Sequence, residues 1–178
     1  ESYSEQYDAN GSLLQLQVRS RDAQGNSIAD KQLDYQRHPH APAFAFVNHK
    51  TGYRETVTWL DDGRIQLTHA DSPHATAREK ILSVPEPVVA DAGFNQFVRN
   101  HLRRLEQGEK ISFNFLNPAR LDWFHFTAHG KPLDAQTLQV TIAPASVVLR
   151  WLVEPIRLVY ARESGYLLRY EGLTNISL

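Results

Sequence analysis

The sequence predicts a mainly β (α+β) protein, in which a strongly curved antiparallel sheet or incomplete β-barrel wraps around one central amphipathic helix. Over most of the chain, short runs alternate apolar and polar residues with a period of two, and turn-forming residues separate the runs. One segment, 91–108, has the period of a helix instead. Because a large twisted sheet tends to curl and a lone amphipathic helix must bury its apolar face, we expect the sheet to cover the helix.

Residues 1–90 are predicted to form a first β-meander. The Asn-Gly pair at 10–11 and the Asp-Gly pair at 62–63 suit the positive φ angles of tight hairpin turns. In the strand expected at 43–48, neighbouring residues alternate in size rather than in polarity, with two phenylalanines on one side and alanine and valine on the other. We therefore expect both faces of this strand to be covered.

The central helix is predicted over 91–108, with 92–107 inside the sheet. Asp91 can accept a hydrogen bond from the first turn, and Gly108 can adopt the left-handed conformation that ends a helix. Intervals of three and four residues place one apolar stripe on this helix, made of Phe94, Phe97, Val98, His101, Leu102 and Leu105.

Residues 109–178 are predicted to form a second β-meander. The alternation of Leu138, Val140 and Ile142 is typical of a strand with one buried face. Between two prolines, 146–153 is ambiguous between strand and helix, and we favour a short helix. No linker or repeat divides the chain, so the sequence predicts a single domain over 1–178.

Composition excludes several classes of function. The formal charge is −1, which gives no general attraction to nucleic acid or to an anionic membrane. There is no cysteine, so disulfides and thiolate metal sites are excluded. No apolar run is long enough for a transmembrane helix. Because the chain begins at Glu1 without methionine, we expect that a signal peptide has been removed or that the chain has been trimmed.

Candidate catalytic and metal-binding residues are few. His125 and His129 would stand about 13 Å apart along a strand, too far to share one zinc ion. His101 lies on the apolar stripe, where packing is favoured over a catalytic role because no nucleophile or carboxylate is placed beside it. Nucleotide-binding, dinucleotide-binding and G-x-S-x-G motifs are missing from the sequence. We therefore assign no catalytic residue, metal ligand or cofactor.

The best candidate binding site is a group of large side chains on the helix and in the second meander. Core filling is the simpler explanation for them, although a curved sheet leaves a cavity more readily than a flat sandwich does. The candidate ligand-binding residues are Phe94, Phe97, His101, Phe113, Phe115, Trp123, Phe126 and Trp151.

Three segments, 91–98, 115–122 and 168–175, together resemble a family of exported proteobacterial proteins of unknown function; they read DAGFNQFV, FLNPARLD and LRYEGLTN. The order of strands and helix also resembles the open half-barrel of periplasmic lipoprotein carriers, whose helices plug a concave apolar sheet. The first resemblance implies a cleaved signal peptide and a periplasmic location. The second implies an architecture and carries over no residue.

The predicted function is non-enzymatic binding of an apolar or amphipathic, lipid-like ligand between helix and sheet, with no protein partner identified. One alternative is a hydrolase or isomerase that uses His101 or His125 with a nearby carboxylate. Another is an envelope scaffold whose exposed edge strand recruits a partner.

Overall fold

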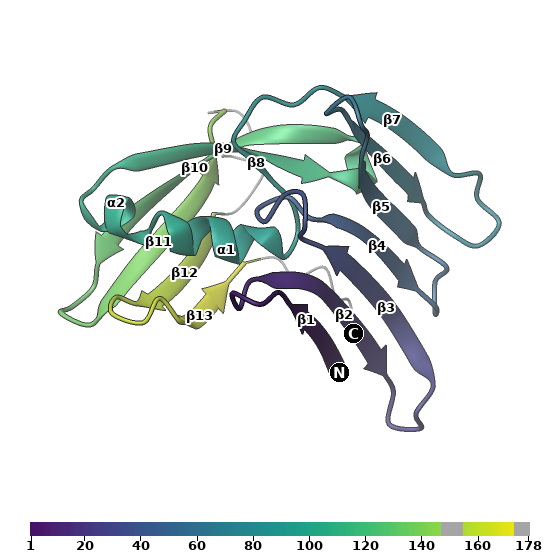
Figure 1. Ribbon diagram of the computed structural model, residues 1–178, viewed down its shortest axis with the longest axis horizontal. Helices are drawn as coiled ribbons and strands as arrows, with labels where there is room; N and C mark the ends of the chain where they lie inside the picture. Colours follow the sequence, from purple (N-terminus) through teal and green to yellow (C-terminus); the bar gives the residue numbers. More distant parts are fainter. Residues whose placement is uncertain (147–154, 173–178) are drawn as a thin grey trace. The chain divides into compact units, whose positions relative to one another are not determined.

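A computed structural model describes residues 1–146 and 155–172 of this chain. With 52% strand and 10% helix, the protein is mainly β, as predicted. The strands form two sheets instead of one continuous curved sheet, and they do not close into a barrel (Figure 1). The chain divides into two compact units, which are described separately: unit 1 comprises 1–94 and 116–123, and unit 2 comprises 95–115 and 124–178. The single domain predicted over 1–178 stays a prediction.

The seven-stranded sheet belongs to unit 1. Its strands follow one another in sequence order and each pairs antiparallel with the next, which makes a meander. Gly11 and Gly63 have positive φ angles of 81° and 84° in two of the connecting turns. The strands are β1 (Ser2–Tyr7), β2 (Leu13–Arg21), β3 (Ser27–Asp34), β4 (Ala43–Asn48), β5 (Arg54–Trp59), β6 (Ile65–Ala70) and β7 (Arg78–Leu82).

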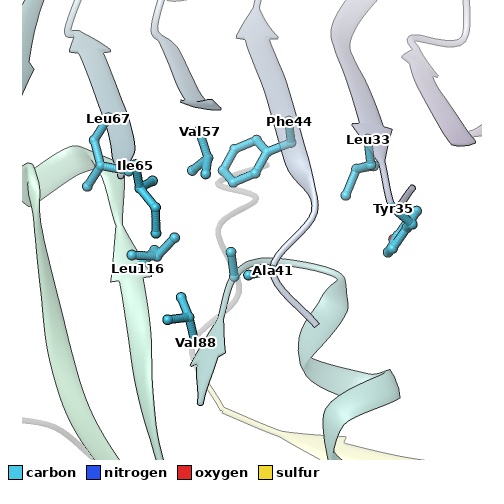
Figure 2. Close-up of a cluster of buried hydrophobic side chains, with 10 residues drawn as sticks. Leu33, Tyr35, Ala41, Phe44, Val57, Ile65, Leu67, Val88 and Leu116 are labelled. Carbon is cyan, nitrogen blue, oxygen red and sulfur yellow. The ribbon is translucent and has the colours of Figure 1, made fainter. Parts of the chain in front are cut away.

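An apolar core covers one face of this sheet. Leu33 pairs directly with Phe44, Phe44 with Val57, and Val57 with Leu67, so one buried side chain from each of four adjacent strands lies in a single row. Figure 2 shows Leu116 facing this row from a different element. The complete buried cluster is Leu33, Tyr35, Ala41, Phe44, Val57, Ile65, Leu67, Val88, Ala90 and Leu116.

The six-stranded sheet has the order β13-β12-β11-β10-β9-β8. Leu138, Val140 and Ile142 are all buried, whereas the residues between them are partly exposed. This agrees with the one-sided strand predicted from their alternation. The strands are β8 (Val88–Val89), β9 (Lys110–Asn117), β10 (Asp122–Pro132), β11 (Thr137–Pro144), β12 (Ile156–Ala161) and β13 (Leu167–Glu171), with a short 3₁₀ turn at Pro118–Arg120.

The prediction of one continuous helix is wrong at His101. The structure has α1 (Gly93–Asn100) and α2 (Leu102–Glu106). The His101 ring nitrogen Nδ1 lies 2.8 Å from the carbonyl oxygen of Phe97, the group that the backbone N–H of His101 would bond in an unbroken helix. That N–H bonds to Val98 instead, at 3.0 Å. Side chain and backbone therefore compete for one carbonyl, and the turn tightens.

The predicted helix ends have different outcomes. Gly108 follows α2 with a φ of 84°, and its N–H bonds to the carbonyl of Leu105 at 3.1 Å, as expected for a terminating glycine. Asp91 accepts a hydrogen bond from the N–H of Ala92, which precedes α1. Asp91 therefore organises the approach to the helix. The short helix predicted at 146–153 lies, beyond Ser146, outside the described residues.

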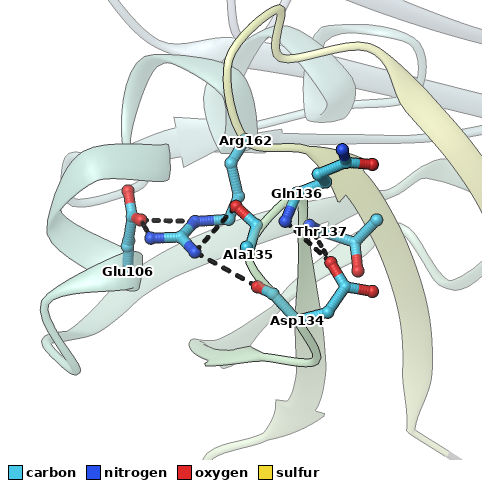
Figure 3. A network of polar contacts seen from close by, with 6 residues as sticks. All are labelled: Glu106, Asp134, Ala135, Gln136, Thr137 and Arg162. Atoms are coloured by element: carbon cyan, nitrogen blue, oxygen red, sulfur yellow. Dashed lines mark hydrogen bonds and ion pairs between the residues drawn. The ribbon is translucent and has the colours of Figure 1, made fainter.

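The helical segment of unit 2 packs directly on strands of the six-stranded sheet. A Cβ atom added to Gly130 in β10 would lie 2.4 Å from the carbonyl oxygen of Leu105. Tyr160 in β12 donates a hydrogen bond to Asn95 at 2.9 Å. Arg162 donates to Glu106 through Nε and Nη2 (Figure 3). Side chains and backbone thus hold both helices against this sheet.

Arg162 also fixes the loop between β10 and β11. Its Nη1 donates to the carbonyl oxygens of Asp134 and Ala135, both at 3.1 Å. The Asp134 carboxylate in turn accepts the backbone N–H groups of Gln136 and Thr137, each at 2.7 Å, and these bonds lower its pKa. One guanidinium therefore joins α2 to this loop (Figure 3).

Gly130→Ala should destabilise the protein by about 2 kcal/mol, because the added methyl group meets backbone that cannot move without displacing α2. Gly172→Ala is the matched control: its Cβ would meet only side-chain atoms of Ile156 and Tyr170, at 3.1 Å, so it should cost about 1 kcal/mol or less. Urea denaturation of both variants measures the two free energies of unfolding. If both variants lose the same free energy of unfolding, α2 does not pack against Gly130.

Candidate functional site

Five of the candidate ligand-binding residues form a connected group of rings in unit 2. The ring of Phe97 lies 4.4 Å from that of His101 and 5.0 Å from that of Phe113, measured between centroids. Phe126 lies 6.0 Å from Phe113 and 6.2 Å from Phe115. Phe97 and Phe113 are buried. These rings therefore pack against one another, as core side chains do.

The other three candidates do not join this group. Phe94 and Trp123 belong to unit 1, where Trp123 packs at the margin of the apolar cluster. Trp151 lies outside the described residues. An apolar binding site built from all eight residues stays a prediction.

Neither histidine of the enzymatic alternative has a carboxylate partner among the described residues. His101 uses Nδ1 to contact the Phe97 carbonyl, and the exposed His125 places Nδ1 2.8 Å from the side-chain oxygen of Asn114. Within residues 1–146 and 155–172, no group of three His, Cys, Asp or Glu side chains is arranged to hold a metal ion. In the same residues, no helix has the length and apolar character that a bilayer span requires.

A groove of about 550 Å³ lies on the seven-stranded sheet, across β1 to β5. Half of its lining side chains carry amides or hydroxyls, and Asp34 alone among them is charged. We call this the amide groove. Its lining residues are Ser4, Gln6, Gln15, Leu16, Gln17, Gln32, Leu33, Asp34, Ala43, Phe44, Ala45, Thr56, Val57 and Thr58.

Strand register determines the chemistry of the amide groove. Phe44 and Val57 pair with each other and belong to the core face, so their neighbours Ala45 and Thr56, which also pair, lie on the opposite face. On that face Ser4 pairs with Gln17, which pairs with Gln32. The alanines of β4 leave a low floor between longer side chains of β3 and β5.

The groove has unused hydrogen-bonding capacity. Among the described residues, the side-chain amides of Gln6, Gln15 and Gln32 make no hydrogen bond, and each has two donors and an acceptor to offer. Gln17 accepts a bond from Arg19 at 3.1 Å, which orients its amide. With only one charged side chain in the lining, the amide groove can match a neutral ligand that both donates and accepts hydrogen bonds.

A row of ionisable side chains crosses the core face of the same sheet. Glu55 on β5 pairs directly with His69 on β6, and Phe46 lies between Glu55 and Lys31 in the strand register. Lys31 donates to Asp91 at 2.5 Å. The row therefore lies directly beside the apolar row, two residues along each strand from Leu33, Phe44, Val57 and Leu67.

The ionisable members of this row each bond to a partner outside the row. Tyr53 donates to Glu55 at 2.6 Å, and burial raises the pKa values of both groups, with the hydrogen bond opposing this for Glu55. His69 is 3% exposed and places Nε2 2.8 Å from the Asp71 carboxylate, while its Nδ1 is buried with no partner among the described residues. Because His69 is closed to solvent, the amide groove is the better candidate site.

Our reading of the sequence missed the amide groove, although two signals for it are present. The size alternation at 43–48 places alanines on the face opposite Phe44, but the prediction that both faces of this strand are covered is wrong, because Ala45 is exposed. Glutamine also recurs at alternate positions, at 15 and 17. What the sequence did not reveal is that Gln32 and Thr56 lie beside these residues.

Comparisons with protein-family models, with curated proteins and with solved structures found no match to this chain.

Glu55→Gln should stabilise the protein increasingly as the pH rises. Burial raises the pKa of folded Glu55 above its usual value of 4.5, so the folded state holds the proton more tightly. The stability that this gives is complete below the unfolded pKa and is lost as the pH rises through the folded pKa, whereas Gln is neutral throughout. Urea denaturation from pH 4 to pH 8 should show that the free energy of unfolding of the variant rises relative to that of the wild type.

Asp62→Asn is the control of opposite sign. Hydrogen bonds from Arg64 lower the pKa of Asp62, so the wild type benefits from this carboxylate above its unfolded pKa and loses the benefit as the pH falls. If the difference in free energy of unfolding between Glu55→Gln and the wild type does not change with pH, the pKa of folded Glu55 is not raised.

Proposed function

We propose that this chain is a non-enzymatic binding protein that holds an uncharged, hydroxyl-rich ligand, such as a short oligosaccharide, in the amide groove. The observation that carries this proposal is a groove of about 550 Å³ with an alanine floor, around which Gln6, Gln15 and Gln32 present amides without hydrogen bonds among the described residues. A volume of this size is ordinary for a small-molecule site.

Ligands of other chemistry fit the amide groove less well. An apolar ligand would cover amide and hydroxyl groups without bonding them, and each buried polar group left unsatisfied costs about 1–3 kcal/mol. A charged ligand would find one lining charge, on Asp34, and no cation. A sugar hydroxyl donates and accepts hydrogen bonds, as a glutamine amide does.

The spacing of the groove suits a ligand with repeated polar groups. Neighbouring strands lie about 4.8 Å apart, and side chains on one face repeat about every 6.8 Å along a strand. Ser4, Gln17 and Gln32 form one such row across three strands, and Gln6 and Gln15 begin the next. Since the described side chains that point into the groove include no aromatic ring to stack on a sugar, hydrogen bonds dominate, and we expect weak affinity in the micromolar to millimolar range.

Simultaneous Gln15→Ala and Gln32→Ala substitution should weaken binding of a neutral oligosaccharide about tenfold, because two hydrogen bonds of about 0.5–1.5 kcal/mol each are lost. Gln24→Ala is the matched control, since Gln24 is exposed in the turn between β2 and β3 and lies outside the groove. Two-dimensional NMR titration with maltotriose, chitotriose and a trimer of galacturonic acid measures the dissociation constants.

In this titration, resonances of β1 to β5 should shift with a neutral trisaccharide and not with the acidic one. Absence of shifts with every neutral sugar at tens of millimolar, or equal affinity in the double variant and in Gln24→Ala, would contradict the proposal.

Ala45→Tyr should abolish sugar binding without loss of stability. Ala45 is exposed on the groove floor, so a tyrosine there occupies the ligand's volume, and tyrosine favours strands more than alanine does. The same NMR titration together with urea denaturation checks both expectations. Sugar binding with wild-type affinity would show that the ligand lies elsewhere.

Apolar-ligand binding by the aromatic group of unit 2 stays a separate prediction. Titration with an unlabelled fatty acid distinguishes the two sites, because chemical-shift changes of the Phe97 and Phe113 ring resonances would report binding at the aromatic group, whereas changes of the Gln15 and Gln32 side-chain amides would report binding in the amide groove.

A further inference from the structure

Strand β13 is an edge strand with large apolar side chains exposed to solvent. It is the last strand in the order of its sheet, so one of its two edges has no partner strand among the described residues (Figure 1). Leu168 is 59% exposed and Tyr166, just before the strand, is 68% exposed; Leu167 and Tyr170 are also exposed. Such an edge is a template for pairing with another strand.

Edge strand β7 of the other sheet is protected from pairing by charge. Edge strand β7 presents the exposed charged residues Arg78, Glu79 and Lys80 in succession. Strand β13 has two charged residues, Arg169 and Glu171, which pair with each other within the strand. Three charged residues in succession discourage another strand from pairing with β7, and β13 has no such run of charges.

We propose that β13 pairs antiparallel with β13 of a second copy of this chain, which forms a twofold-symmetric dimer with a sheet continuous across the interface. The two charged residues select the register. Pairing centred on Tyr170 places Arg169 of each copy opposite Glu171 of the other. Centring on Arg169 or on Glu171 would instead oppose like charges, which is unfavourable.

The same register uses the apolar residues. Tyr170 meets its symmetry mate across the axis, and Leu168 lies opposite Gly172, whose lack of a side chain leaves room for the leucine. A strand of five residues makes a small interface compared with the 1,200–2,000 Å² typical of stable complexes, so we expect a dissociation constant in the micromolar range.

Charge-reversal variants test the register as well as the dimer. Arg169→Glu and Glu171→Arg should each weaken self-association at least about tenfold, because twofold symmetry makes every substitution act at two places. A mixture of the two variants should associate as the wild type does, since each acidic position then faces a basic one. Sedimentation equilibrium at low salt, over a micromolar concentration series, measures all four samples.

Leu168→Lys should also give a monomer, and Ile81→Lys is its matched control, because Ile81 is an exposed apolar residue on edge strand β7. Circular dichroism verifies that every variant is folded. The proposal is overturned if the wild type stays monomeric throughout the series. It is equally overturned if the single charge variants associate like the wild type, or if a mixture of the two variants does not recover association.

Discussion

The register of the seven-stranded sheet is the constraint on which the rest of unit 1 depends. Phe44 opposite Val57 places both side chains in the apolar core, and because side chains alternate between faces, Ala45 opposite Thr56 must point the other way. A slip of one residue would move the core side chains into solvent and bury the polar ones. The burial that stabilises this sheet therefore also creates the amide groove.

The ionisable row shows the cost of using the core face for charge. Lys31 lies 5.7 Å and 5.4 Å from the ring centroids of Phe44 and Phe46, and its ammonium group bonds to Asp91. Ring faces and a carboxylate thus replace the water that this cation loses. Glu55 has a hydrogen-bond donor in Tyr53, yet burial still raises its pKa. Because these groups bond to other parts of the protein, they have little hydrogen-bonding capacity left for a ligand. The glutamines of the opposite face keep that capacity.

In unit 2, contacts with the backbone determine where the helices lie. Gly130 allows the Leu105 carbonyl to approach β10 more closely than any side chain would permit. Arg162 then joins Glu106 to the loop after β10. The break at His101 is compatible with this seating because α2 is held by its own contacts. The rings of Phe97 and Phe113 fill the space that remains, which explains why an apolar stripe read from the sequence corresponds to packed core.

Local patterns in the sequence were sufficient to determine the mainly β class, the apolar alternation of β11 and the helix end at Gly108, because each depends on neighbours a few residues apart. They did not reveal that the strands separate into two sheets, since that depends on which strands pair over long distances. The His101 break was missed because helical periodicity does not report a side chain competing for a carbonyl. The exported family and the periplasmic location stay predictions. The amide groove was decided by tertiary structure alone: Gln15, Gln32 and Thr56 are far apart in sequence, and only the antiparallel register makes them neighbours.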